Sequence, residues 1–373
     1  MPIYKMNGKK NGKQKYRVRI NYIDSYGKAK QIDRVAYGNE EAKQLERELA
    51  YTLKEQKPAQ KITVQALFDE YVLAKRTELR TSTFESTCQI MNTHILPTLG
   101  SCKLDKLTPP TLQAWKNKIN EKEYKISSKR SFYKKFHAVL DFGVKMGYLP
   151  TNPLERVGTF QATLEPPKKM DFYTIDEFRM FIRAAKEYCQ TAQPYEWNFY
   201  VFFCIAFYTG LRKGEIYALT WEDLQGDEIS ITKSLSQKLK GGDVITPPKN
   251  ASSIRTVSIP QPLRTTLINH KKFLTENNIF KSDNFICGGS RPIRDSAVRS
   301  RNKLFAELAD IKQIRIHDFR HSHASLLINE GINIQEVARR LGHADISTTL
   351  KTYAHLYPSE KDRATSILDK IEM

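Results

Sequence analysis

Polar and apolar side chains alternate near the start of the chain, and this alternation predicts a small β-sheet. Apolar residues occupy every second position from Tyr16 to Tyr22, which is the period of a half-buried strand. Another strand is expected through 32–36, and Asn39 then precedes two glutamates, a pattern that favours the start of a helix. We therefore expect residues 1–57 to form a small three-stranded sheet plus one helix.

Apolar residues at helical spacing predict that the second segment, 62–155, is entirely helical. Pro and Gly at the ends of these periodic runs set the expected boundaries. The first of the four expected helices follows Thr63 as a cap, and the second spans 84–95 and stops at Pro97 and Gly100. The third begins at Pro109 behind the cap Thr108, and the fourth spans 128–146.

A third segment is expected over 173–373, after a linker without periodicity at 154–172. Thr174 followed by Glu177 has the spacing of a capping box at a helix start. The longest apolar run, 199–208, is too short for a membrane span and fits a buried helix. Strands are expected at 229–231 and 255–259, in one short sheet. The predicted fold class is multidomain and mainly α, with small β-sheets (α+β).

The amino-acid composition is that of a soluble globular protein. The chain has 373 residues, of which 40% are hydrophobic and 27% charged, as in soluble globular proteins. No secretory signal is visible at the N-terminus, so a cytoplasmic location is expected, with no membrane partner. The five cysteines are odd in number and none forms a CxxC pair, which argues against disulfides and thiolate zinc sites.

The formal net charge is +19, and such a surplus favours a polyanionic partner. Lys and Arg that neutralise phosphates release counterions, which gives salt-sensitive affinity for nucleic acid. Two faces are candidates for DNA binding, and the alternative for both is an ordinary solvated surface. Their residues are Arg17 and Arg19 on the expected strand, and Lys129, Arg130 and Lys134 at the start of the helix over 128–146.

Polar residues in the third segment suit the breakage of a phosphodiester without a metal. Such a reaction needs cations for the phosphate oxygens, a nucleophile and a proton for the leaving oxygen. Arg212 follows the apolar helix, and His317 stands three residues before Arg320, which places both on one helical face. Asp345 can cap a short helix that carries Tyr353.

These residues occur in motifs that resemble those of the tyrosine recombinase, or phage integrase, family. Residues 209–215 (TGLRKGE) are similar to its first arginine box, and 317–321 (HDFRH) to its His-x-x-Arg box. Residues 341–343 (LGH) and 348–353 (TTLKTY) resemble its histidine and nucleophile box, and Lys249 with Arg255 its hairpin lysine region. Residues 1–57 look like the arm-binding domain of integrases from Gram-positive phages and conjugative transposons.

The resemblance implies a role for each matching residue. Arg212 and Arg320 clamp the scissile phosphate, and Tyr353 attacks it to form a 3′-phosphotyrosine, so that neither a nucleotide nor a metal cofactor is needed. His317 assists proton transfer, and His343 donates to a phosphate oxygen. The resemblance further assigns leaving-group protonation to Lys249, with Lys233, Lys238 and Lys240 nearby as alternatives, and support of the site to Glu215.

The family also implies a fold and partners. These are an arm-type DNA-binding domain (1–57), a helical, SAM-like core-binding domain (62–155) and a catalytic domain of the DNA breaking-rejoining fold (173–373). The expected function is integration and excision of a mobile element through a Holliday junction, by a homotetramer on double-stranded DNA with arm-type and core-type sites. An excisionase and a host DNA-bending protein are implied partners, on the bacterial nucleoid.

Other interpretations remain open. A chromosome or plasmid dimer-resolving recombinase would share the chemistry, and a non-catalytic DNA-binding regulator would share the scaffold. Five of the eight histidines follow residue 316, which raises zinc as an alternative, although no cysteine lies among them. Three of these histidines, His321, His323 and His355, are expected to be structural. The apolar stripe Ala364, Ile367, Leu368 and Ile371 predicts a terminal helix that contacts a neighbouring subunit or packs in cis.

Overall fold

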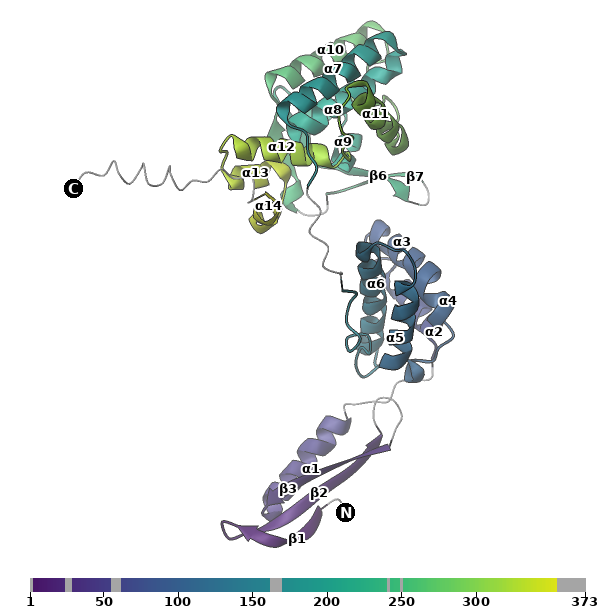
Figure 1. The fold of residues 1–373 in the computed structure, drawn as a ribbon, viewed down its shortest axis with the longest axis vertical. Coiled ribbons are helices and arrows are strands. Elements are labelled where there is room, and N and C mark those ends of the chain that lie inside the picture. Colours follow the sequence, from purple (N-terminus) through teal and green to yellow (C-terminus); the bar gives the residue numbers. More distant parts are fainter. Residues whose placement is uncertain are drawn as a thin grey trace, which may run out of the picture. The chain divides into compact units, whose positions relative to one another are not determined.

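The computed structural model describes residues 3–23, 29–54, 62–161, 170–239, 242–248 and 251–353. It separates into two compact units, Met1–Pro166 and Pro167–Met373. Helices predominate in both, with small antiparallel sheets, as Figure 1 shows. The expected fold class is therefore confirmed. The apolar stripe at 364–371 and the middle of the expected linker lie outside the described residues.

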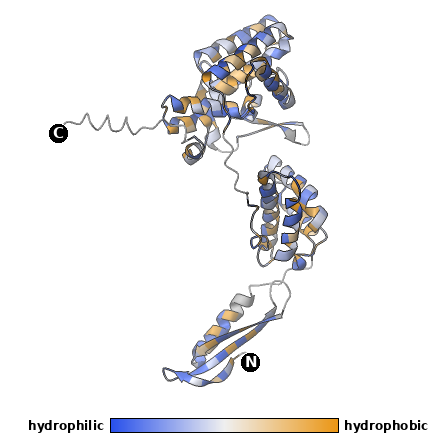
Figure 2. Ribbon diagram, in the orientation of Figure 1, coloured by the Kyte–Doolittle hydropathy of each residue, from blue (hydrophilic) through white to orange (hydrophobic). Residues whose placement is uncertain are grey.

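The N-terminal part of the first unit has the predicted sheet and helix. Strands β1 (Ile3–Lys10), β2 (Lys13–Ile23) and β3 (Ala29–Tyr37) are antiparallel in that order, and α1 (Asn39–Lys54) follows. Val18, Ala36 and Ala42 form a buried cluster between sheet and helix. The alternation of hydrophilic and hydrophobic residues along the strands is visible in Figure 2. Arg17 and Arg19, at odd positions around Val18, therefore point to the opposite face.

The rest of the first unit is helical. Its elements are α2 (Val64–Lys75), α3 (Thr81–Ile90), the π-helical turn η1 (Met91–Ile95), α4 (Leu96–Leu99), the 3-10 turn η2 (Leu104–Lys106), α5 (Pro109–Asn120) and α6 (Ile126–Lys145). A cluster of buried side chains that includes Leu67, Trp115 and Phe136 forms their core. The Thr63 hydroxyl accepts a hydrogen bond from the Ala66 amide at 3.2 Å, as expected of a cap.

Two predicted helix ends differ from the structure in detail. The second helix stops at Gly100, as predicted, but not at Pro97, because the wider π-helical turn η1 precedes the proline and places it in the first turn of α4, where a missing N–H is tolerated. Thr108 does precede α5, but its hydroxyl makes no cap bond to the backbone. It lies 3.1 Å from the hydroxyl of Thr111 instead.

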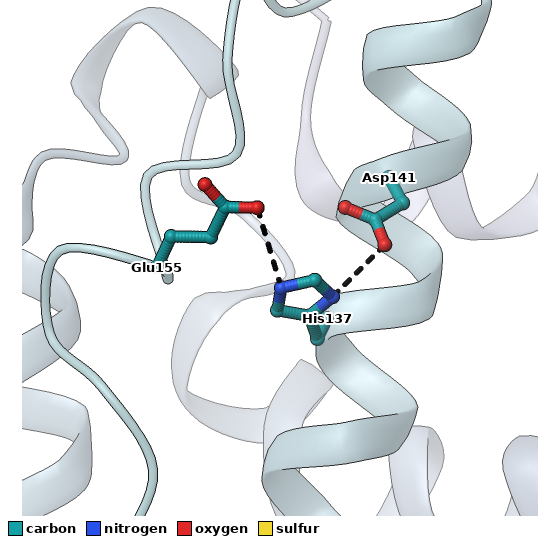
Figure 3. Close-up of side chains that lie close together, drawn as sticks. All are labelled: His137, Asp141 and Glu155. Atoms are coloured by element: carbon teal, nitrogen blue, oxygen red, sulfur yellow. Dashed lines mark ion pairs between the residues drawn. The ribbon is translucent and has the colours of Figure 1, made fainter.

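An ionic trio fastens α6 to the segment that follows it (Figure 3). His137 and Asp141 stand one turn apart on the helix, with Nδ1 and Oδ2 at 2.9 Å. The other ring nitrogen, Nε2, lies 3.7 Å from Glu155 in the following segment. The trio contains metal-ligating residue types, but both ring nitrogens already face a carboxylate. We therefore interpret it as an ion-pair clamp.

The second unit carries the remaining helices and two sheets. Its elements are α7 (Ile175–Thr191), η3 (Pro194–Glu196), α8 (Trp197–Thr209), α9 (Lys213–Ala218), η4 (Trp221–Asp223), β4 (Leu224–Gln225), β5 (Glu228–Ile231), β6 (Ser234–Leu239), β7 (Gly242–Thr246), η5 (Ala251–Ser253), β8 (Arg255–Ser258), α10 (Gln261–Glu276), α11 (Asp295–Leu308), α12 (Asp318–Asn329), α13 (Ile334–Leu341) and α14 (Ile346–Tyr353).

Helix α8 is the central element of this unit. It contacts α7, α10 and α12, and ten of its 13 residues are buried, as the apolar run 199–208 predicts. The expectation of one sheet is wrong, because the described residues of this unit form two sheets. Strands β4, β5 and β8 form the predicted sheet, while β6 and β7 pair with each other as a separate hairpin. Figure 1 shows this hairpin at the edge of the unit.

The division into three domains stays a prediction. The first unit contains two separate hydrophobic clusters, one in the sheet and α1 and one in the helices α2 to α6. The second unit has its own large cluster around α7 and α8. None of the helices in the described part of the chain has the length and apolar character that crossing a membrane requires.

Candidate active site

Arg212 lies at the junction of two helices. Helix α8 ends at Gly210, whose φ of 64° is left-handed, and Arg212 is the residue that precedes α9. A Cβ at Gly210 would lie 2.6 Å from the ring of His323, so only glycine fits. The Arg212 guanidinium donates from Nη2 to the carbonyl oxygen of Gly342 at 3.1 Å. The arginine thus joins the end of α8 to the loop after α13.

Glu215 holds two arginines in place from a buried position. Its carboxylate accepts from Arg212 Nη1 at 2.9 Å and from Arg255 Nη2 at 3.0 Å. Burial alone would raise the pKa of this carboxyl group, but the hydrogen bond and charge of Arg255, with those of Arg212, outweigh burial and lower it. Glu215 is therefore ionised, and it links the start of α9 to the start of β8.

Arg255, which the hairpin lysine region contains, is a member of this network whose role the motifs did not indicate. Its side chain is 5% exposed and donates from Nε to the carbonyl oxygen of Arg340 at 2.8 Å. It also crowds Gly342, where a Cβ would meet Nη1 at 2.7 Å, so the left-handed turn after α13 requires glycine. Arg255 is thus a positioning residue for the loop that carries His343.

One nitrogen of the Arg320 guanidinium is available to donate a hydrogen bond to a ligand. Its Nη1 donates to the Gly210 carbonyl oxygen at 2.9 Å, whereas Nη2 is buried and has no hydrogen-bond partner among the described residues. Burial and the nearby charge of Arg212 lower the pKa of Arg320 to about 9, so it remains a cation at neutral pH. A buried, unpartnered guanidinium nitrogen next to a second arginine is a strong anion site.

Two histidines border the arginine pair. His317 precedes α12, and burial lowers its pKa to about 4, with the charges of His321 and Arg320 contributing. His343 follows Gly342, and burial and the charges of Arg320 and Arg212 lower its pKa to about 4 as well. Its Nδ1 lies 2.7 Å from the Thr349 hydroxyl on α14. Both imidazoles are neutral at pH 7 in the free chain.

Tyr353 ends α14 and is only 1% exposed. Asp345 begins this helix as predicted, since it accepts from the Ser347 amide at 2.8 Å. Burial raises the pKa of the phenol to about 12, while the charge of Arg320 acts in the opposite direction. The phenol oxygen lies 2.6 Å from Nδ1 of His321. The structure thus brings Tyr353 into the electrostatic reach of Arg320.

His321 and His323, two of the histidines that raised the zinc alternative, face different partners, and His355 lies outside the described residues. His323 is buried, with Nδ1 at 2.8 Å from the Phe207 carbonyl oxygen and Nε2 accepting from Arg340. His321 faces Tyr353 instead. His323 is therefore structural, as expected, whereas His321, also expected to be structural, contacts the candidate nucleophile.

The candidate lysine cannot be located in the same way. Lys249 and Lys240 lie outside the described residues, and nothing is described of the Lys238 side chain. The remaining alternative, Lys233, lies 2.9 Å from a carboxylate oxygen of Asp223, in an ion pair. The proton donor to the leaving oxygen therefore stays a prediction.

The expected DNA-binding residues are partly engaged within the protein. Arg19 pairs with Asp33 at 2.9 Å, and Arg17 is half-buried. On α6, Arg130 donates to the Phe160 carbonyl oxygen at 3.0 Å, and Lys129 to that of Asn120 at 3.3 Å. Lys134 is exposed on the same helix. Their contact with DNA stays a prediction.

Replacing Glu215 with glutamine should destabilise the protein by about 3 kcal/mol, because two partly desolvated arginines lose their shared counter-charge. Urea unfolding of the full chain measures this. The matched control is Glu336→Gln, which removes an exposed ion pair with Arg339 and should cost less than about 0.5 kcal/mol. Equal effects of the two substitutions would contradict the role given to Glu215.

The fold and the site together define a class of protein. The second unit brings together two arginines, two neutral histidines and a tyrosine from four separate parts of its chain. This is the arrangement expected of a tyrosine recombinase, an enzyme that breaks and rejoins DNA. A model of the phage integrase family matches residues 172–360, more than half of the chain, and a model of the phage integrase N-terminal SAM-like domain matches 63–120. The chain belongs to the phage integrase family.

Relatives extend this likeness over almost the whole chain. The ICEBs1 integrase of Bacillus subtilis is 29% identical over 371 residues, which cover 97% of this chain and 98% of that protein. A XerC-like tyrosine recombinase of Caldanaerobacter subterraneus is 26% identical over 73% of each chain. The chain is therefore similar to integrases over its N-terminal part as well.

Solved structures support the same fold. An integrase of the Tn1549 transposon, in complex with transposon right end DNA, has a TM-score of 0.65 at 20% identity, over 82% of this chain and 98% of that chain. A lambda integrase tetramer bound to a Holliday junction has a TM-score of 0.54 at 15% identity, over 93% and 96% of the two chains. At these identities the likeness shows the fold.

Proposed function

We propose that this chain integrates and excises a mobile element by cutting DNA with Tyr353. The observation that carries the proposal is the unpartnered Nη2 of Arg320, buried beside Arg212 and within electrostatic reach of the Tyr353 phenol. Two guanidinium groups can neutralise the charge that develops on a phosphate during attack. A phosphodiester is the anion that suits both this cationic pocket and an adjacent nucleophile.

The proposed reaction is a pair of transesterifications. The phenol oxygen of Tyr353 attacks the phosphorus, the bond to the 5′ oxygen breaks, and a 3′-phosphotyrosine remains. Neutral His317 accepts the phenol proton, and Lys249 supplies a proton to the leaving 5′ oxygen. A 5′ hydroxyl from the partner duplex then attacks the phosphotyrosine and reverses these transfers. One ester replaces another at each step, so no nucleotide is consumed.

The remaining side chains fit supporting roles. His343 donates to a nonbridging phosphate oxygen, with its ring held by Thr349. Glu215 orients Arg212 and Arg255 and does not take part in proton transfer. A hollow of about 350 Å³ beside His317 is lined by Lys213, Arg299 and Arg315, among others, and these cations suit the flanking DNA backbone.

The proposed partner is double-stranded DNA in a synapse of four protomers. Solved relatives include a transposon integrase with transposon right end DNA and a lambda integrase tetramer on a Holliday junction. We assign core-type sites to α6, with Lys129, Arg130 and Lys134, and arm-type sites to the face of Arg17 and Arg19. An excisionase and a host DNA-bending protein would set direction, on the nucleoid in the cytoplasm.

The proposal is tested by recombination between two plasmid-borne attachment sites. The purified full chain should join paired sites, through a protein–DNA adduct that resists boiling in detergent, without added nucleotide or divalent metal. A resolvase of chromosome or plasmid dimers would instead act on two copies of one site. Binding without any adduct would favour the non-catalytic regulator, although the complete arginine–histidine–tyrosine set argues against it.

A further inference from the structure

The phenol of Tyr353 already has a hydrogen-bond partner in the DNA-free protein. Its oxygen lies 2.6 Å from Nδ1 of His321 on α12, and the rings are 5.6 Å apart between centroids. The side chain as a whole is 1% exposed. A phosphate oxygen cannot come into contact with a phenol that is covered in this way. Attack on DNA therefore requires Tyr353 to leave this position.

Nδ1 of His321 can accept a hydrogen bond from the phenol of Tyr353. Burial lowers its pKa, while Asp318 raises it and Arg320 and Arg315 lower it further, so the ring is neutral at pH 7. Its ring packs edge-on against His317, with centroids 5.1 Å apart. The second partner of α14 is the Thr349 contact to His343. Among described contacts, these two polar bonds hold α14 to the site.

We propose that His321 is a positioning residue that holds Tyr353 in a resting place, and that strand cleavage begins when the phenol exchanges His321 for the scissile phosphate. The inference rests on the proposed role of Tyr353 as nucleophile. The two arrangements exclude each other, because the phenol cannot be covered at His321 and lie in line with a phosphorus atom at the same time. His321 therefore sets the fraction of chains whose nucleophile is free.

The test compares two substitutions at this half-exposed position. His321→Leu removes the acceptor, whereas His321→Asn keeps an oxygen close to the place of Nδ1. Adduct formation is timed on a nicked suicide substrate at saturating full-length protein. We expect the leucine variant to react about fivefold faster than the wild type, the equivalent of one neutral hydrogen bond, and the asparagine variant to react at nearly the wild-type rate.

A slower leucine variant would overturn the inference. If asparagine restores the rate, the hydrogen bond aligns the phenol for attack, and if asparagine is equally slow, His321 accepts the phenol proton in the reaction. Equal rates for all three proteins would also overturn the inference, since the hydrogen bond to His321 would then not restrain Tyr353. Affinity for the same DNA is measured alongside, and we expect it to be unchanged within about twofold. A change in folding or DNA binding is thereby separated from a change in the freedom of the nucleophile.

A second measurement does not depend on activity. Hydrogen exchange of the α14 amides is compared in the DNA-free wild type, His321→Leu and Tyr353→Phe. Both variants lose the same hydrogen bond, so both should exchange faster in α14 and equally in α7. Unchanged exchange would refute the resting contact. If both variants exchange faster in α14 but the wild type forms no adduct on DNA, the resting contact stands and Tyr353 is rejected as the nucleophile.

Discussion

Replacing Tyr353 with phenylalanine is expected to abolish the covalent protein–DNA adduct while DNA binding persists. The change removes one oxygen, and the buried ring keeps its packing against α12 and α13. Loss of a nucleophile removes the covalent pathway, so we expect a decrease in adduct of at least about ten-thousandfold. The measurement is a denaturing gel of labelled suicide substrate, with affinity determined by mobility shift.

The control for this substitution is Tyr195→Phe. Tyr195 is 49% exposed and precedes α8 on the surface of the same unit. This variant should form adduct at the wild-type rate. A Tyr353→Phe protein that still forms adduct would mean that another residue attacks the DNA, and the assignment of the nucleophile would have to be abandoned.

Replacing Arg320 with lysine is expected to slow adduct formation about a thousandfold. The guanidinium uses one nitrogen for the Gly210 carbonyl and leaves Nη2 for the phosphate, and a single ammonium group cannot do both. Loss of one preorganised donor to a developing negative charge costs two to three powers of ten, and loss of a phosphate-clamping arginine costs at least as much. Single-turnover kinetics on the suicide substrate measure the decrease.

The matched control is Arg179→Lys on α7, where the arginine is 70% exposed and, within the described part of the chain, pairs with Asp176 at 2.9 Å. It should leave the rate unchanged. Thermal unfolding of both variants separates a fold defect from a catalytic one. An Arg320→Lys protein that is folded and retains more than about a tenth of the wild-type rate would show that Nη2 is not the phosphate donor.

The local geometry of the candidate catalytic motifs could be predicted from the sequence, because each motif is short and its residues lie close together along the chain. Arg212 and Glu215 are three residues apart, and a helix that starts between them brings one to the other. Asp345 and Tyr353 delimit a single helix in the same way. The sheet at the N-terminus was predictable for a related reason, since its alternation is set by one buried face.

Contacts between distant segments were not predictable in this way. Arg255 meets Glu215 across 40 residues of sequence, and His321 meets Tyr353 across 32. A helical turn between His317 and His321 placed the two rings together, but nothing local indicated which partner would face them. The π-helical turn before Pro97 and the separate β6–β7 hairpin also depend on packing and pairing that a hydrophobic pattern does not specify.

The account depends on one chemical bond, between the phenol oxygen of Tyr353 and a 3′ phosphate. The most direct measurement is mass spectrometry of the adduct, trapped on a suicide substrate, digested with nuclease and protease and sequenced. We predict a nucleotide on the peptide that contains Tyr353, attached through its 3′ phosphate. A nucleotide attached to any other side chain, or joined through a 5′ phosphate, would contradict the account.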